Sequence, residues 1–213
     1  MITLTLVAIL GALLVIVLVQ LAKKPAKPRP GSFPPSPDLA NLKAADARKG
    51  DVISVTGAGD DMTDLDFTAD RCAWVEAGTH RWFELGGPYR ERRVTLRVAT
   101  GDDAEVSLQS DARKVSIEDL GLAETDLAEM DERQNTADNF EFDGKVWMYR
   151  LSREAQTKND DQPHPLGFYY WEFREQGGAG LLAVRKAEGE PFGVSLFRVV
   201  NPGDVTVYRG GAG

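Results

Sequence analysis

Two glutamates stand among aromatic residues in two similar stretches of the sequence. The first stretch is Trp82-Phe83-Glu84-Leu85 and the second is Tyr170-Trp171-Glu172-Phe173. A carboxyl group in apolar surroundings can have a raised pKa and act as a general acid or base. Strand alternation explains the same pattern without chemistry, because every second side chain faces solvent or pairs with an arginine. The sequence favours this second interpretation: Trp82, Glu84, Trp171 and Glu172 become binding candidates, and no catalytic residue is predicted.

Carboxylates are densest in one short loop, which is a pattern to test for a metal site. The loop contains Asp60, Asp61, Asp64 and Asp66. Calcium prefers such oxygen ligands, but the spacing lacks the alternating ligands, central glycine and closing glutamate of an EF-hand. Asn159-Asp160-Asp161 with His164 has the same weakness. We therefore expect solvated acidic turns in both places, with no metal and no cofactor.

The single cysteine, Cys72, could face His80 across a hairpin, which is the minimum arrangement for a thiolate nucleophile. No third residue is evident to orient the pair, so a buried structural cysteine is the favoured interpretation. One cysteine also permits no intrachain disulfide, which fits a reducing compartment. The stretch Gly57-Ala58-Gly59 lacks the rest of a phosphate-binding loop.

The elements that position these residues begin with an apolar segment. Residues 2–22 contain no charged side chain and are long enough for a single transmembrane helix. A signal peptide is the competing interpretation, but no basic residue precedes the run and no cleavage pattern ends it. Lys23, Lys24, Lys27 and Arg29 follow it, and basic flanks stay in the cytoplasm. We therefore predict a single-pass cell-membrane protein with its N-terminus outside and the rest cytoplasmic.

Residues 23–37 are rich in proline and basic residues, which predicts an extended linker. A proline-rich ligand at Pro34-Pro35-Ser36-Pro37 is the alternative. The chain has 33 acidic against 25 basic residues, a formal net charge of −8, and some of its cations lie in this linker. Such a surface repels a phosphate backbone, so we expect no nucleic acid partner.

After the linker the sequence predicts a mostly β protein in three parts. Residues 38–111 form a first β unit with a short leading helix that Gly50 ends, residues 112–139 an acidic helical connector, and residues 140–210 a second β unit. Strands are expected in the first unit at 52–55, 67–75, 81–85, 93–98 and 105–108, with turns that include Gly86-Gly87-Pro88. In the second unit they are expected at 140–142, 145–151, 168–173, 181–185, 193–200 and 205–208.

The two β units resemble each other in three places. The aromatic-glutamate stretches lie 88 residues apart, Leu96-x-Val98 and Leu182-x-Val184 lie 86 apart, and Val106-Ser107-Leu108 and Val194-Ser195-Leu196 lie 88 apart. This register predicts an internal repeat of two related antiparallel units, barrel-like or sandwich-like. They should pack together because a small sheet rarely buries enough surface alone. The pattern leaves one barrel and two packed sheets as alternatives.

Three motifs also give the chain a family resemblance. They are Gly50-Asp51 at the start of a strand, the aromatic-glutamate strands at 82–85 and 170–173, and the Leu-x-Val strand that follows each. In these features the chain resembles bacterial proteins that carry the domain of unknown function DUF4178. The resemblance covers most of residues 40–210 and implies no reaction, substrate or catalytic residue.

These observations support three hypotheses about function. The first is a non-catalytic protein-binding or scaffold module at the inner membrane face, with the lipid bilayer contacted through residues 2–22 and a membrane or membrane-proximal protein as its partner. The second is an enzyme with a carboxylate-based or divalent-metal site between the two β units. The third is a structural membrane protein that organises a complex through its span.

Overall fold

The computed structural model describes residues 42–101, 105–111, 113–159 and 164–210. The predicted transmembrane segment, 2–22, and the linker, 23–37, lie outside these residues. Within the described ranges, no helix combines the length and the apolar character needed to cross a bilayer. The chain divides into two compact units, 1–37 and 38–213, and the fold below is that of the second unit.

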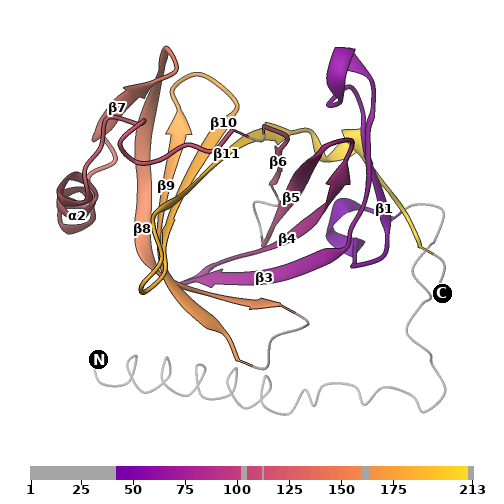
Figure 1. Ribbon diagram of the computed structural model, residues 1–213, viewed down its shortest axis with the longest axis horizontal. Coiled ribbons are helices and arrows are strands. Elements are labelled where there is room, and N and C mark those ends of the chain that lie inside the picture. Colours follow the sequence, from indigo (N-terminus) through magenta and orange to yellow (C-terminus); the bar gives the residue numbers. More distant parts are fainter. Residues whose placement is uncertain (1–41, 102–104, 112, 160–163, 211–213) are drawn as a thin grey trace, which may run out of the picture. The chain divides into compact units, whose positions relative to one another are not determined.

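The elements follow one another along the chain as Figure 1 labels them. The first half contains η1 (Ala44–Asp46), β1 (Val52–Val55), η2 (Asp60–Met62), β2 (Leu65–Thr68), β3 (Arg71–Ala77), β4 (His80–Tyr89), β5 (Arg92–Thr100) and β6 (Val106–Gln109). The second half contains α2 (Glu124–Arg133), β7 (Asn139–Phe142), β8 (Lys145–Asn159), β9 (Leu166–Glu175), β10 (Gly180–Lys186), β11 (Gly193–Val200), η3 (Pro202–Asp204) and β12 (Val205–Tyr208). The prediction of a mostly β fold is confirmed.

Eight strands close into one barrel (Figure 1). Their order is β3-β4-β5-β6-β11-β10-β9-β8, and β8 pairs back with β3 through residues 156–159. The remaining strand of this sheet, β7, pairs with residues 145–148 of β8. Of the two alternatives that the sequence left open, the structure has the single barrel. Closure explains this outcome, because each half alone would leave strand edges without hydrogen-bond partners.

The matched sequence stretches occupy equivalent strands in the two halves of the barrel. The aromatic-glutamate stretches lie on β4 and β9, the Leu-x-Val stretches on β5 and β10, and the third pair on β6 and β11. Strands β3 to β6 form one half and β8 to β11 the other, and the halves meet at two antiparallel seams, β6–β11 and β3–β8. The barrel is thus built from two consecutive four-strand meanders.

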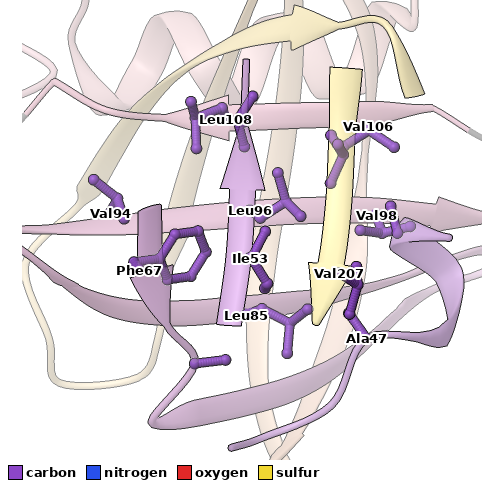
Figure 2. Close-up of a cluster of buried hydrophobic side chains, with 14 of the residues drawn as sticks. Ala47, Ile53, Phe67, Leu85, Val94, Leu96, Val98, Val106, Leu108 and Val207 are labelled. Atoms are coloured by element: carbon purple, nitrogen blue, oxygen red, sulfur yellow. The ribbon is translucent and has the colours of Figure 1, made fainter. Parts of the chain in front are cut away.

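A small sheet covers the outer face of the first half. Its order is β12-β1-β2, so the last strand of the described chain pairs with the first. Apolar side chains fill the space between this sheet and strands β4 to β6 (Figure 2). Ile53 and Val207 of the small sheet face Leu85, Leu96 and Leu108 of the barrel there. Burial of this cluster joins the small sheet to the barrel.

The outer face of the second half has a different cover. Ile117, Leu120, Leu127 and Met130 come from α2 and the turns before it, and they pack on outward-facing residues of β8, β9 and β10. The predicted helical connector, 112–139, is confirmed only in part, because the α-helix covers Glu124–Arg133. Ser116 and Asp119 instead cap a separate turn, in which the Ser116 backbone N–H donates to Asp119 over 2.9 Å.

Two expected elements in the first half are wrong. The described part of the expected leading helix contains only the 3-10 turn η1, since Leu42 and Ala47 pack into the core cluster of the small sheet. The expected strand 67–75 breaks at Ala69 and Asp70 into β2 and β3. The chain leaves the small sheet at this break and enters the barrel.

The expected turn at Gly86-Gly87-Pro88 is also wrong. Strand β4 continues through it to Tyr89, and the chain reverses at Arg90, whose φ is 51°. Gly87 allows the backbones of β2 and β4 to approach each other closely, because a Cβ on Gly87 would collide with the carbonyl oxygen of Thr68. Strand β2 can therefore lie against β4 only because position 87 has no side chain.

Replacing Gly87 with alanine is expected to lower the free energy of unfolding by about 2–3 kcal/mol, because the backbone of β2 must move away. Chemical denaturation of the full-length chain measures this loss. Gly167→Ala on β9 is the matched control, since a Cβ there has no atom within 4 Å. The control should change stability by less than about 1 kcal/mol. Equal effects at both positions would show that the contact with Thr68 is unimportant.

Candidate functional site

The barrel interior brings together three of the four predicted binding residues. Trp82 and Glu84 point inward from β4, and Glu172 points inward from β9 beside Tyr170. The rings of Trp82 and Tyr170 lie 5.1 Å apart, centroid to centroid. Because β4 and β9 are not neighbours in the sheet, this contact crosses the interior of the barrel.

The negative charge of Glu84 is balanced by an arginine from the other half of the barrel. Arg185 on β10 forms a bidentate ion pair with it, and the Trp82 indole donates a hydrogen bond to Oε1 over 2.8 Å. Burial by itself would raise the pKa of Glu84, but the charge and hydrogen bonds of Arg185 and the bond from Trp82 outweigh it. The pKa of Glu84 therefore lies below its ordinary value, and the carboxylate stays ionised at neutral pH.

Glu172 lies in a larger network of charges. Its Oε2 accepts from Arg97 Nη2 and from the Tyr170 hydroxyl, each over 2.9 Å. Its Oε1 accepts from Arg174, which also binds Glu105 through two hydrogen bonds of 2.7 and 2.9 Å. Burial opposes ionisation of Glu172, but Arg97 and Arg174 more than compensate, so its pKa also lies below the ordinary value. Burial raises the pKa of Tyr170, which remains a neutral donor.

The two ion pairs repeat the symmetry of the fold. Glu84 of the first half pairs with Arg185 of the second, and Glu172 of the second half pairs with Arg97 of the first. Both carboxyls have lowered pKa values, whereas a general acid at neutral pH needs a raised one. The interpretation of these glutamates as arginine-paired strand residues agrees with this geometry, although both are buried.

A cavity of about 680 Å³ opens beside the Glu172 network, and we call it the Arg97 cavity. Its lining includes His80, Trp82, Arg97, Ala99, Thr100, Glu105, Leu151, Glu172 and Arg174. The Arg97 side chain is 6% exposed and its guanidinium lies 4.5 Å from the Trp82 ring centroid. Among the described residues, Arg97 donates one hydrogen bond, to Glu172; its Nε has no partner, and its Nη1 lies 3.9 Å from Glu105. A guanidinium has five N–H donors, so most of them remain unused.

The fourth candidate, Trp171, lies on the other side of β9. Its ring packs in the outer cluster, and its indole N–H donates to the carbonyl oxygen of Leu127 on α2 over 3.1 Å. Beside it, Asp131 of α2 accepts hydrogen bonds from Tyr169 and Ser152 over 2.7 and 2.5 Å. Trp171 therefore holds the helix on the barrel, and it does not line the Arg97 cavity.

The Trp171→Phe variant is expected to lower the free energy of unfolding by about 1–2 kcal/mol, because the hydrogen bond to α2 is lost and a small void remains. Thermal unfolding of the full-length chain measures the change. Trp74→Phe is the control, since Trp74 is 50% exposed and packs on Phe83 at the barrel surface. A larger loss for Trp74→Phe than for Trp171→Phe would contradict this role.

The remaining candidates do not assemble into a site. Asp60 is bound by Arg90 and Arg92 over 2.6 and 2.7 Å. No group of three acidic, histidine or cysteine side chains in the described ranges could hold a metal ion. The favoured interpretation of Cys72 as a buried structural residue agrees with the structure: Cys72 is buried and lies opposite Leu85 in the β3–β4 hairpin, whereas His80 lies opposite Ala77. Asp160 and Asp161 lie outside the described residues.

Sequence reasoning missed the arginines of the interior. Arg97, Arg174 and Arg185 lie on strands in which apolar residues flank or precede them, such as Leu96 and Val98 around Arg97. The sequence signal for an interior arginine is an arginine between two apolar residues of a strand. If the apolar residues pack against the outer cover of a barrel, alternation turns the arginine between them into the barrel interior. Comparison with protein-family models, with curated proteins and with solved structures found no match to the chain.

Proposed function

We propose that this protein is a non-catalytic binding module, and that the Arg97 cavity receives a carbonyl or carboxylate oxygen of a protein partner. The observation that carries the proposal is the buried Arg97 guanidinium, which lines a cavity while donating one hydrogen bond to Glu172. Its remaining N–H groups are suited to an acceptor brought in by a partner. An ionised or carbonyl acceptor from a partner would form charge-assisted hydrogen bonds with the Nη groups of Arg97, which are stronger than hydrogen bonds between neutral groups.

The lowered pKa values of Glu84 and Glu172 support binding over acid–base catalysis. Each carboxylate has an arginine partner that keeps it ionised, so neither is prepared to hold a proton at neutral pH. The network also fixes the Arg97 guanidinium in one orientation, because Glu172 and the Trp82 ring hold it from two sides. A preorganised donor lowers the entropic penalty of binding.

The predicted transmembrane segment bears on the cellular location of this module. We propose that residues 2–22 hold it at the cytoplasmic face of the membrane and that the partner is a membrane or membrane-proximal protein. Extraction of cell membranes with alkaline carbonate tests the anchor: the full-length chain should stay in the pellet. A chain with residues 2–22 deleted should move to the soluble fraction. A full-length chain that is extracted completely would overturn the anchor and leave the cavity proposal intact.

The binding proposal is tested by filling the cavity. Ala99 lines it from β5, so Ala99→Phe should occupy space that the partner needs. The full-length tagged chain is used to capture partners from detergent-solubilised membranes, with Thr206→Phe as a matched exposed control on β12. We expect a specific protein that binds wild type and Thr206→Phe, with recovery at least about tenfold lower for Ala99→Phe. Undiminished capture by Ala99→Phe, or no specific partner, would overturn the proposal.

A further inference from the structure

A second cavity, of about 580 Å³, lies at the opposite end of β5 from the Arg97 cavity. Arg92 and Thr95 of β5 line this second cavity, whereas Arg97 and Thr100 line the first. Its lining contains Arg71, Arg92, Arg93, Arg113 and Lys114 against the carboxylates of Glu91 and Asp111, and we call it the basic cavity. The chain as a whole carries −8, so positive charge is concentrated here against the trend of the composition.

Three of its cations are held in place by ion pairs. These are Arg92 with Asp60, Arg93 with Asp70 and Arg113 with Asp111. The other two, Arg71 and Lys114, form no ion pair within the described ranges of the chain. Gly86 makes room for Arg71: a Cβ on Gly86 would lie 3.0 Å from the Arg71 Nη2 atom. The guanidinium of Arg71 thus lies against the β4 backbone with its donors available at the cavity.

An apolar wall lines the same cavity as these cations. Val115, Phe192 and Val194 contribute it, and each is partly exposed. The Phe192 ring packs 6.1 Å from Trp171, centroid to centroid, and the Lys186 ammonium lies 4.8 Å from its centroid. These contacts fix the ring as a flat apolar surface beside positive charge. A purely inorganic anion would leave this wall exposed to water.

We propose that the basic cavity binds an organic anion, in which a carboxylate, sulfonate or phosphate group is attached to an aromatic or aliphatic body. Arg71 and Lys114 bind the charged group, and the wall formed by Val115, Phe192 and Val194 covers the apolar body. Arg92 and Arg93, which Asp60 and Asp70 hold in place, line the same cavity and contribute to its positive potential. This site is separate from the Arg97 cavity and does not depend on the protein partner proposed for it.

The test uses 8-anilinonaphthalene-1-sulfonate, a fluorescent aromatic sulfonate, titrated into the full-length protein in detergent at constant salt. Arg71→Ala/Lys114→Ala should weaken its affinity at least about tenfold, since each lost charged hydrogen bond contributes close to that factor. Arg150→Ala/Lys158→Ala removes the same charge from exposed positions of β8 and should change affinity less than about twofold. Ala99→Phe should bind the probe like wild type. Equal affinity of wild type and Arg71→Ala/Lys114→Ala would overturn the proposal.

Competition then identifies the source of the anion. Displacement of the probe by octanoate supports a free organic acid, and displacement by a soluble short-chain phosphatidylglycerol supports a lipid headgroup; both retain the shared chemistry. Inorganic phosphate should compete at least about tenfold less well, because it cannot use the apolar wall. If inorganic phosphate competes equally, or if neither organic anion competes, the proposed ligand class is wrong.

Discussion

Replacing Arg185 with methionine is expected to lower the free energy of unfolding by about 3 kcal/mol, the largest effect of any single substitution considered for this protein. The substitution leaves the Glu84 carboxylate inside the barrel with the Trp82 indole as its remaining hydrogen-bond donor among the described residues, although the charge of Arg97 still acts on it. Glu84 is 9% exposed, so water cannot replace the arginine. Arg185 itself is 28% exposed, which places the loss at the lower end of the range for a broken buried pair. Urea denaturation followed by tryptophan fluorescence measures it.

A second variant separates charge from packing. In Glu84→Gln/Arg185→Met the side chain at position 84 is neutral and can still accept a hydrogen bond from Trp82. We expect this double variant to recover at least about 1 kcal/mol relative to Arg185→Met alone, because no unpaired charge remains in the interior. If the double variant is no more stable than the single one, the loss comes from packing of the Arg185 side chain on the Phe168 and Tyr170 rings.

Acid is expected to destabilise the protein steeply, because both interior glutamates have lowered pKa values in the folded state. The ordinary value for Glu84 is 4.5, and the folded value lies below it. The stability that the two ion pairs contribute is therefore complete above pH 4.5 and is lost as the pH falls through the folded pKa values. Each group contributes a slope of up to about 1.4 kcal/mol per pH unit within that interval.

Urea denaturation of the wild type at several pH values between neutral and strongly acidic measures this slope. Glu84→Gln/Arg185→Met should show a shallower slope, because one of the two groups no longer titrates. Glu188→Gln, at an exposed position, is the control for removing any carboxylate, and it should keep the wild-type slope. An identical slope in wild type and Glu84→Gln/Arg185→Met would mean that Glu84 does not drive the acid sensitivity.

The sequence indicates the strands and the repeat well because these depend on local pattern. Alternation and turn residues locate most strands, and the three repeated stretches fall on equivalent strands of the barrel. Strand β8 shows where local pattern fails. It runs from Lys145 to Asn159, far beyond the expected end at residue 151, because a bulge between Tyr149 and Leu151 interrupts the alternation.

The interior of the barrel was harder to predict because its partners are remote in sequence. Glu172 meets Arg97 across 75 residues and Glu84 meets Arg185 across 101. Alternation places Glu84 on the same strand face as Trp82, and Glu172 on the same strand face as Arg174, but it does not tell whether that face points to solvent or into a closed barrel. Trp171 illustrates the same limit, since its neighbour Glu172 points inward while Trp171 packs under α2.

Pairing of β12 with β1 has a consequence for synthesis of the chain. Strand β1 has both of its neighbours only after Val205–Tyr208 have been synthesised. The β3–β8 seam can form only after residues 156–159 have been synthesised. A nascent chain that has just exposed its first meander therefore has β1 and β2 but not β12 to cover the face formed by Leu85, Leu96 and Leu108, and it has two open strand edges. Such surfaces attract other chains, and non-local pairing is slow. Folding of this domain should be completed only after its last strand leaves the ribosome, with chaperones protecting the first half until then.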